Sequence, residues 1–186
     1  MNHFSVRPMK EEDISLIMNY WRKCSDEDFL RMGLDKSKFI ISAAFEENLK
    51  NILHSSPDET NIYFLMWELN GKTVGYSPLR NLKRNEIGDI HLQMFDASLR
   101  GKGYGAILFC LSVVKFYELF NLKMILCEPR SSNPMPNRLL EKIGFDKWKT
   151  YISTPAEVAL TCELNSYIIN GDKANLFLDK AGINNP

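Results

Sequence analysis

Apolar residues recur along this chain at two spacings, and together they predict an alternation of strands and helices. Residues 3–7 alternate as in a short strand that Pro8 ends. Asp13 then caps a helix whose apolar side chains repeat at helical spacing. A second helix is predicted over about 37–54, and the polar segment 55–58, which contains a proline, ends it. The N-terminal third is therefore expected to be a strand followed by two helices.

The middle of the chain predicts an antiparallel meander. Residues 62–69 and 73–76 are both rich in strand-forming side chains, and Asn-Gly at 70–71 separates them. These two residue types favour the positive φ angles of a tight hairpin. A polar turn at 83–85 and a strand over 87–95 follow. Three consecutive antiparallel strands are expected.

The second half returns to alternating helices and strands. Residues 103–121 are apolar apart from a thin polar stripe, which indicates a helix buried against a sheet. A short apolar strand at 122–127 precedes a helix that begins at the prolines near 134 and stops at Gly144. Two further strands, 145–151 and 158–169, close the sheet.

These elements form one unit without a repeat or a linker. Residues 1–170 are expected to fold as a single α/β domain with a mixed, twisted central sheet flanked by helices. Residues 171–186 form a weakly patterned tail that is expected to fray. The three tryptophans are expected in the core.

Composition and charge exclude several classes of function. The 186 residues are 45% hydrophobic and 25% charged, which is typical of a globular domain. Lys plus Arg and Asp plus Glu both number 23, so no overall field attracts nucleic acid or an anionic membrane. We expect neither partner. An anionic ligand must then be held by a local site.

The cysteines and the N-terminus carry no targeting or metal signal. None of the four cysteines belongs to a C-x-x-C pair or stands at ligand spacing from a histidine, so reduced thiols and no metal are expected. The first residues, MNHFSVRPMKEED, lack the apolar run of a signal peptide. No stretch approaches the ~20 apolar residues of a membrane span. A cytoplasmic location is expected.

The segment from Arg100 to Gly105, RGKGYG, is the most informative part of the chain. It stands between a predicted strand and a predicted helix. Glycines allow the backbone to approach a ligand, and their N–H groups, together with the helix N-terminus, form an anion site. Leu108 replaces the third glycine of a dinucleotide fingerprint, and no Gly-Lys-Ser/Thr of a P-loop follows. A diphosphate remains the fitting ligand.

The same segment resembles the Arg/Gln-x-x-Gly-x-Gly/Ala signature of the GNAT superfamily of acyl-CoA N-acyltransferases. A second block, in which Asn133 precedes Gly144-Phe145 by eleven residues, is similar to a further element of that family. The order of the upstream elements also agrees with the family fold. The resemblance covers most of the chain, and residues 87–145 carry its specificity.

The resemblance implies a binding site for acetyl-CoA. Backbone groups of Met94 and Phe95 would pair with the pantetheine arm, and an amide there would hold the oxyanion. Asn133 would contact the distal part of CoA, with Asn137 as a weaker companion. The backbone amides of the loop would bind the pyrophosphate, namely those of Arg100, Gly101, Lys102, Gly103, Tyr104 and Gly105. Arg100 and Lys102 would add positive charge at the rim.

One position departs from the family pattern. Leu140 stands where many relatives have a tyrosine that protonates the leaving thiolate. The thiolate then leaves unassisted, being a good leaving group with a thiol pKa near 8.5, or another donor serves. The assignment of a general acid stays open.

The strand before the loop offers the catalytic base. Strand alternation places Asp89, His91 and Gln93 on one face. Each of these polar side chains would cost ~1–3 kcal/mol if it were buried at the sheet centre without a partner. Asp89 precedes Arg100 by eleven residues, the position of the catalytic carboxylate in several family members. His91 is the better base at neutral pH, with a titration expected between about pH 5.5 and 7.5. Three roles stay open: His91 as base, Asp89 or a water chain as base, and a structural His91 bonded to Asp89.

The expected reaction is direct transfer of an acetyl group from acetyl-CoA to a primary amine of a small molecule, peptide or protein. A cysteine nucleophile at Cys127, beside Glu128, is conceivable, but core packing of this thiol is favoured. The rival interpretation is a CoA-binding regulatory domain without catalysis. A homodimer is left open.

Overall fold

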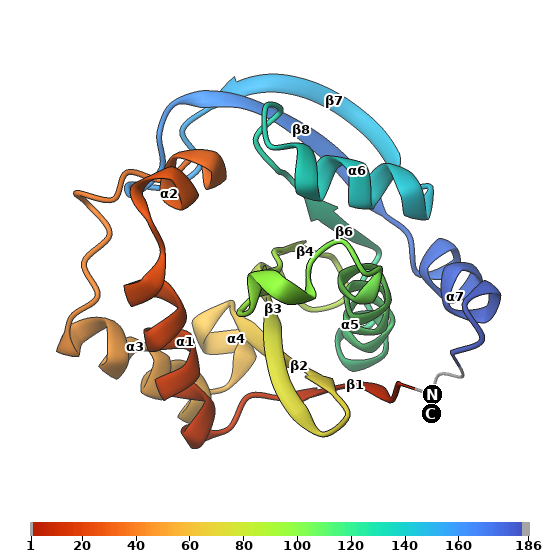
Figure 1. The fold of residues 1–186 in the computed structure, drawn as a ribbon, viewed down its shortest axis with the longest axis horizontal. Helices are drawn as coiled ribbons and strands as arrows, with labels where there is room; N and C mark the ends of the chain where they lie inside the picture. The colour runs from red at the N-terminus through yellow and green to blue at the C-terminus, as the bar shows by residue number, and fades with distance from the viewer. Residues whose placement is uncertain (1, 184–186) are drawn as a thin grey trace.

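A computed structural model describes residues 2–183 (Figure 1). Strands and helices alternate along the chain, with one short 3₁₀ turn before the longest helix. In chain order they are β1 (Phe4–Pro8), α1 (Glu11–Lys23), α2 (Asp26–Met32), α3 (Ala43–His54), α4 (Pro57–Thr60), β2 (Tyr63–Leu69), β3 (Lys72–Lys83), β4 (Ile87–Ile90), β5 (Gln93–Met94), η1 (Ala97–Leu99), α5 (Tyr104–Phe120), β6 (Met124–Cys127), α6 (Pro134–Ile143), β7 (Asp146–Ser153), β8 (Cys162–Ile169) and α7 (Gly171–Lys180).

The strands form one mixed sheet in the order β1-β2-β3-β4-β6-β8-β7, with β5 paired to β3 alone. Every pairing is antiparallel except β4 with β6. The parallel pair follows from the long crossover through α5, which returns the chain in the same direction. The predicted α/β class with a mixed central sheet is confirmed.

Helices cover both faces of the sheet (Figure 1). One core cluster joins α5, α6 and α7 to the inner strands, with Phe109, Phe116 and Leu140 fully buried. A second cluster joins α1, α2 and α3 to the opposite face, around Trp21 and Tyr76. The central strands are thus fixed between two apolar layers, which places their ends reproducibly.

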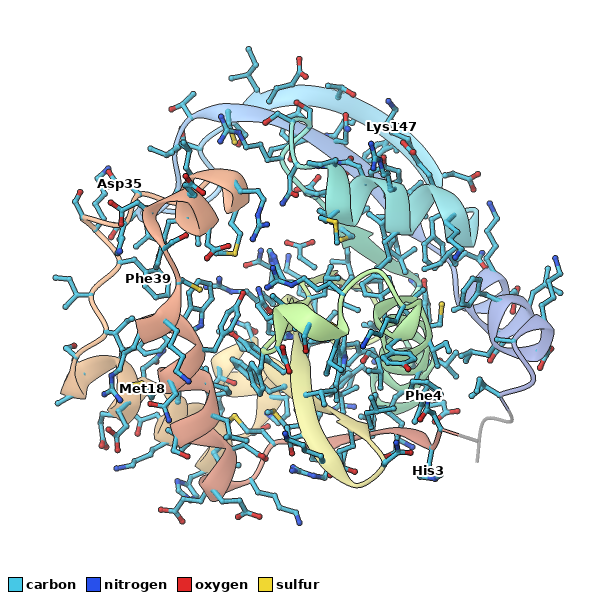
Figure 2. The ribbon with its side chains drawn as sticks, in the orientation of Figure 1. His3, Phe4, Met18, Asp35, Phe39 and Lys147 are labelled. Atoms are coloured by element: carbon cyan, nitrogen blue, oxygen red, sulfur yellow. The ribbon has the colours of Figure 1, made fainter. Side chains whose placement is uncertain are left out.

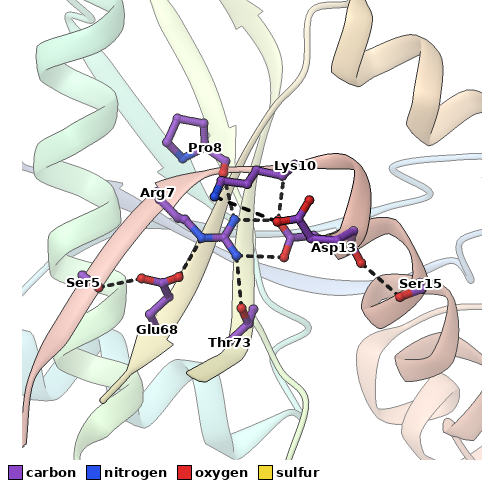
Figure 3. Close-up of polar contacts among 9 residues, drawn as sticks. Ser5, Arg7, Pro8, Lys10, Asp13, Ser15, Glu68 and Thr73 are labelled. Atoms are coloured by element: carbon purple, nitrogen blue, oxygen red, sulfur yellow. Dashed lines mark hydrogen bonds and ion pairs between the residues drawn. The ribbon is translucent and has the colours of Figure 1, made fainter. Parts of the chain in front are cut away.

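An ion-pair network anchors the start of α1 to the sheet (Figure 3). Arg7 donates from both terminal nitrogens to Asp13, at 2.6 and 2.9 Å, and from Nε to Glu68 at 2.7 Å. Asp13 does not cap α1 as predicted: Lys10 occupies the N-cap, and its N–H donates to Asp13 Oδ2 at 2.8 Å. The carboxylate lies one turn inside the helix because Arg7, on the neighbouring strand, holds it there.

The N-terminal half contains two helices that the sequence did not predict, α2 and the short α4. Ser25 begins α2 with a capping box to Asp28, and Gly33, at φ 77°, ends it. The next helix starts at Ala43 rather than near 37, because the preceding link inserts Phe39 against Trp21 with ring centroids 4.5 Å apart (Figure 2). The segment around 55–58 ends α3 as expected and then forms the single turn of α4.

The strand predicted over 87–95 is interrupted. β4 ends at Ile90 and β5 begins at Gln93, although the pairs from Asp89 to Met94 keep one register against β3. Pro78 lies opposite His91, and it accepts the His91 N–H at 3.0 Å but has no N–H to return. The ladder is therefore broken at His91 by a proline on another strand.

The C-terminal segment also differs from its prediction. Residues 171–180 form α7, which buries Ala174 and Leu178 against the core instead of fraying. Trp148 is not a core residue, because 56% of it is exposed on the outermost strand β7, which also carries Lys147 (Figure 2). The tryptophans Trp21 and Trp67 are buried as predicted.

Candidate active site

The glycine loop presents a row of backbone amides. Gly101 and Gly103 adopt left-handed φ angles of 75° and 84°, and no protein atom lies within 4 Å of the position that a Cβ would take at either residue. The N–H groups of residues 101–103 have no acceptor in the described part of the chain. Tyr104 and Gly105 open α5, where the first N–H groups lack an intrahelical partner. The predicted loop residues thus present unpaired N–H groups at a helix N-terminus, an arrangement that favours an anion.

Beside this loop, one strand edge is open. β4 and β6 pair only as far as Asp89 and Leu126, and β5 pairs with β3 alone. In an antiparallel pair, every second residue of a strand directs its N–H and C=O at the partner strand. Phe95 is one of the residues directed at β3, because its N–H donates to Val74 at 2.9 Å. The N–H and C=O of Met94 therefore face the open edge. The resemblance implied both residues, but Phe95 has no free N–H to offer.

Arg100 points along this edge rather than out at the rim. Its Nη2 donates to the carbonyl oxygen of Met94 at 3.3 Å. The positive charge also lies near Tyr20, Cys24 and Asp28, at the first two helices and the link between them. Burial raises the pKa of Tyr20 and of Cys24, and the charge of Arg100 offsets part of that rise. The guanidinium thus links the loop to the N-terminal helices, a placement that the loop motif alone did not predict.

The start of α6 contains two buried asparagines with different surroundings. Asn133, the N-cap, is 8% exposed, and its Oδ1 has no hydrogen-bond partner among the described residues. Asn137 donates to the carbonyl oxygens of Arg130 and Asn133 at 3.0 and 2.6 Å, and accepts from Asn165 and Tyr167 at 2.8 and 3.1 Å. Both amide hydrogens and both lone pairs of Asn137 are used. Asn137 has no group left for a cofactor, whereas Asn133 has one.

Asp89 lies where the pairing of β4 with β6 ends. Asn81 Nδ2 donates to its Oδ2 at 2.6 Å. Burial raises the pKa of the Asp89 carboxyl, the bond from Asn81 lowers it, the nearby Glu128 raises it and Arg80 lowers it, with the net direction upward. A carboxylate with a raised pKa is a better proton acceptor than an exposed one.

The pKa of His91 lies below the range expected from the sequence. Burial and the positive charge of Arg80 lower its pKa from 6.5 to about 4, so the imidazole does not titrate between pH 5.5 and 7.5. Its side chain has no hydrogen bond to Asp89 or to any other described residue, and Asp89 is bonded to Asn81 instead. The described residues therefore lack the hydrogen bond on which the structural alternative, a histidine held by Asp89, was based.

A second carboxylate borders the same region. Tyr151 on β7 donates to Glu128 Oε2 at 2.8 Å, and burial with this bond raises the pKa of Tyr151 to about 12. Neighbouring Cys127 is buried, and burial together with Glu128 and Asp89 raises its pKa far above the ordinary thiol value. Cys127 therefore stays a protonated core thiol at neutral pH, as its packing interpretation expected.

Sequence reasoning missed Asn81 and Tyr151. The sequence placed the end of the third strand at 76 and gave no sign that Asn81 faces Asp89. Tyr151 lies on a strand that is adjacent to β8 and distant in sequence from Glu128. Leu140, the departure from the family pattern, is a fully buried residue of α6 and offers no proton.

A surface depression, a metal site and a membrane-spanning helix are three other kinds of feature that carry function in proteins. A depression of about 500 Å³ between α6 and α7 is bordered by Lys142, Phe177 and Lys180, away from the glycine loop. Residues 2–183 contain no group of three side chains suited to a metal ion. No helix among them has the length and apolarity needed to cross a bilayer.

A mixed sheet whose open edge adjoins a glycine loop and a helix N-terminus offers the kind of anion-binding backbone that a diphosphate-bearing cofactor needs. The match to known families agrees with this: residues 3–146 fit the family model for the acetyltransferase (GNAT) domain. The chain belongs to the GNAT family and is an acyltransferase enzyme. None of the curated protein sequences matches it.

Solved structures share the fold at low sequence identity. A mutant of the spermidine N-acetyltransferase from Vibrio cholerae has a TM-score of 0.71 at 15% identity, covering 96% of this chain and 98% of that one. The same enzyme in complex with CoA and spermine has a TM-score of 0.70 at 15% identity, with 92% and 98% covered. The ribosomal-protein-S5-alanine acetyltransferase from Vibrio fischeri has 0.71 at 17% identity, with 91% and 94% covered.

Proposed function

We propose that this enzyme transfers the acetyl group of acetyl-CoA to a primary amine by direct attack. The observation that carries the proposal is the open backbone of Met94 beside the free amides of the glycine loop. The loop would bind the pyrophosphate through residues 101–105. The pantetheine arm would then run along the open edge of β5 as an added strand.

The residues around the open edge fit the chemistry of the transfer. The N–H of Met94 would face the thioester and donate to the developing oxyanion, since the N–H of Phe95 is bonded to Val74. Asn133 would contact CoA through its unpartnered Oδ1. Arg100 would share the carbonyl oxygen of Met94 with the pantetheine amide, since a carbonyl oxygen has two lone pairs.

The base would be Asp89 rather than His91. A proton must leave the amine nitrogen as the C–N bond forms, and the acceptor should have a pKa close to the working pH. Asp89 has a raised pKa and a fixed orientation, whereas the pKa of His91 has fallen to about 4. Glu128, held by Tyr151, would add negative charge that attracts a cationic acceptor.

The leaving group needs no proton from position 140. A thiol has a pKa near 8.5, so a CoA thiolate can depart as such. Burial raises the pKa of the Cys127 thiol, which disfavours an acetyl-cysteine intermediate. The amine would attack the thioester carbon, the C–S bond would break, and the products would be the acetamide and CoA.

A thiol-release assay with acetyl-CoA tests the proposal. The amine panel should contain a polyamine and an alanine peptide with a free amine, after the acceptors named for the similar structures. A lysine peptide and a simple monoamine complete the panel. We expect amine-dependent release of CoA with at least one class. Tight acetyl-CoA binding without release by any amine would instead support the regulatory alternative, which the apolar Leu140 favours. Light scattering measures whether the chain forms the homodimer that the sequence left open.

A further inference from the structure

A bulge in β3 directs one asparagine at the proposed base. Arg80 pairs with Asp89 and Lys83 pairs with Ile87, so residues 81 and 82 together lie opposite Gly88. At Gly88 a Cβ would come within 2.8 Å of the Leu79 side chain, so the strand opposite the bulge is tightly packed. The bulge is therefore a fixed part of the sheet rather than a local irregularity.

The conformation of Asn81 is unusual for its place. Five residues other than glycine have positive φ in the described chain, and all five are asparagines. Four of them end a helix or form a turn, namely Asn61, Asn70, Asn85 and Asn121. Asn81, at φ 48°, lies inside a strand. Glycine is the usual residue at a left-handed bulge position, so the backbone alone does not require an amide there.

The side chain of Asn81 makes one hydrogen bond, and it is to Asp89. Nδ2 donates to Oδ2 at 2.6 Å, which is short for an N–H···O bond, and bonds to an ionised carboxylate are shorter than neutral ones. No other donor among residues 2–183 reaches the carboxylate, so Oδ1 of Asp89 keeps its lone pairs for another partner. A carboxylate fixed through one oxygen and open at the other has the geometry of a general base.

Several groups set the charge around Asp89. Arg80 on the same strand as Asn81 favours the ionised carboxylate, and Glu128 beyond β6 disfavours it. The carboxylate in turn raises the pKa of Cys127 and of Tyr151. Asn81 is the group that is bonded to the carboxylate, so it determines where the open oxygen points.

We propose that Asn81 is a positioning residue for acetyl transfer, which orients the carboxylate of Asp89 and keeps it ionised for the incoming amine. The inference rests on the proposed function. It assigns the left-handed bulge of β3 a role in the active site, and it explains why an asparagine stands where glycine would satisfy the backbone.

Asn81→Gly is the decisive variant, because glycine keeps the left-handed backbone and removes only the amide. Loss of a bond to the ionised form raises the pKa of Asp89, so the base is protonated at higher pH. We expect the acidic limb of the kcat/KM profile to move upward by about one pH unit, which corresponds to one charge-assisted hydrogen bond. The KM for acetyl-CoA should not change.

Asn85→Gly is the matched control, since Asn85 also has positive φ, at 62°, but bonds to Asn121 in a turn. It should lose similar stability and keep the wild-type pH profile. Asn81→Asp, which places a second carboxylate against Asp89, should move the limb further in the same direction.

The outcomes separate the two proposals. An active wild type whose acidic limb is unchanged in Asn81→Gly, or is shifted equally by Asn85→Gly, overturns the role of Asn81 and leaves the proposed function intact. A wild type that releases no CoA with any amine overturns the proposed function, and the role of Asn81 in transfer falls with it.

Discussion

The guanidinium of Arg100 donates to the carbonyl oxygen of Met94 at 3.3 Å, so the first residue of the glycine-loop motif is bonded to the strand edge that the pantetheine arm would use. The contact joins two features that are separate in the sequence, the loop and the open edge. It also keeps the charge partly buried, near Tyr20 and Asp28, rather than free at the rim. Cofactor binding and the geometry of β5 are therefore linked through one side chain.

Arg100→Ala should weaken acetyl-CoA binding about 5- to 10-fold, the equivalent of one hydrogen bond of ~1–1.5 kcal/mol. Because the guanidinium acts through Met94, the loss should be nearly the same at low and high salt. Lys102→Ala is the contrasting variant: this exposed cation should matter more at low salt, where screening is weak. Calorimetric titrations at two ionic strengths measure both. A loss at Arg100 that shrinks strongly with salt would show that its charge acts on the phosphates instead.

Gly103→Glu should abolish detectable acetyl-CoA binding while the chain stays folded. A carboxylate would lie where the pyrophosphate is proposed to bind, and the left-handed φ of 84° adds ~1–2 kcal/mol of backbone strain. Gly144→Glu is the matched control, because Gly144 has φ 93° and equally open surroundings at the end of α6. Both variants should lose similar thermal stability. Unchanged affinity in Gly103→Glu would remove the loop from the cofactor site.

The sequence was most informative where conformation depends on neighbouring residues. Asn70 and Gly71 adopt the positive φ angles that the hairpin prediction required. Gly103 and Gly144 begin and end their helices as expected. These features are local, because the φ preference of one residue decides them. The glycine loop was visible for the same reason.

Features that depend on a distant strand could not be predicted. The break at His91 has its cause in Pro78, thirteen residues earlier, and is visible only once the two strands are paired. The direction in which the Asn81 side chain points depends on the bulge opposite Gly88. The pKa of His91 depends on burial, which the side-chain alternation of a single strand does not determine. The candidate base was therefore found by position, and its supporting residues were not.

Asn137→Ala should destabilise the protein rather than weaken cofactor binding. The substitution removes four hydrogen bonds and leaves buried partners unsatisfied, for an expected loss of about 2–4 kcal/mol in the free energy of unfolding. Asn51→Ala, in the exposed part of α3, is the control and should change stability little. Denaturant unfolding and CoA titration of the folded variant give the two readings. A large loss of CoA affinity at full stability would return Asn137 to the cofactor site.

His91→Gln tests the lowered pKa of the imidazole through stability. The folded pKa, about 4, lies below the unfolded value of 6.5, so the neutral histidine imposes no penalty above pH 6.5. As the pH falls from 6.5 to 4, the unfolded chain gains a proton that the folded chain resists, and stability decreases by at most about 3 kcal/mol. Glutamine cannot titrate, so the variant should lack this decrease when unfolding is measured across the acidic range. Its kcat/KM profile should keep the wild-type acidic limb if Asp89 is the base. A limb that disappears in His91→Gln, with CoA affinity unchanged, would make the histidine the base after all.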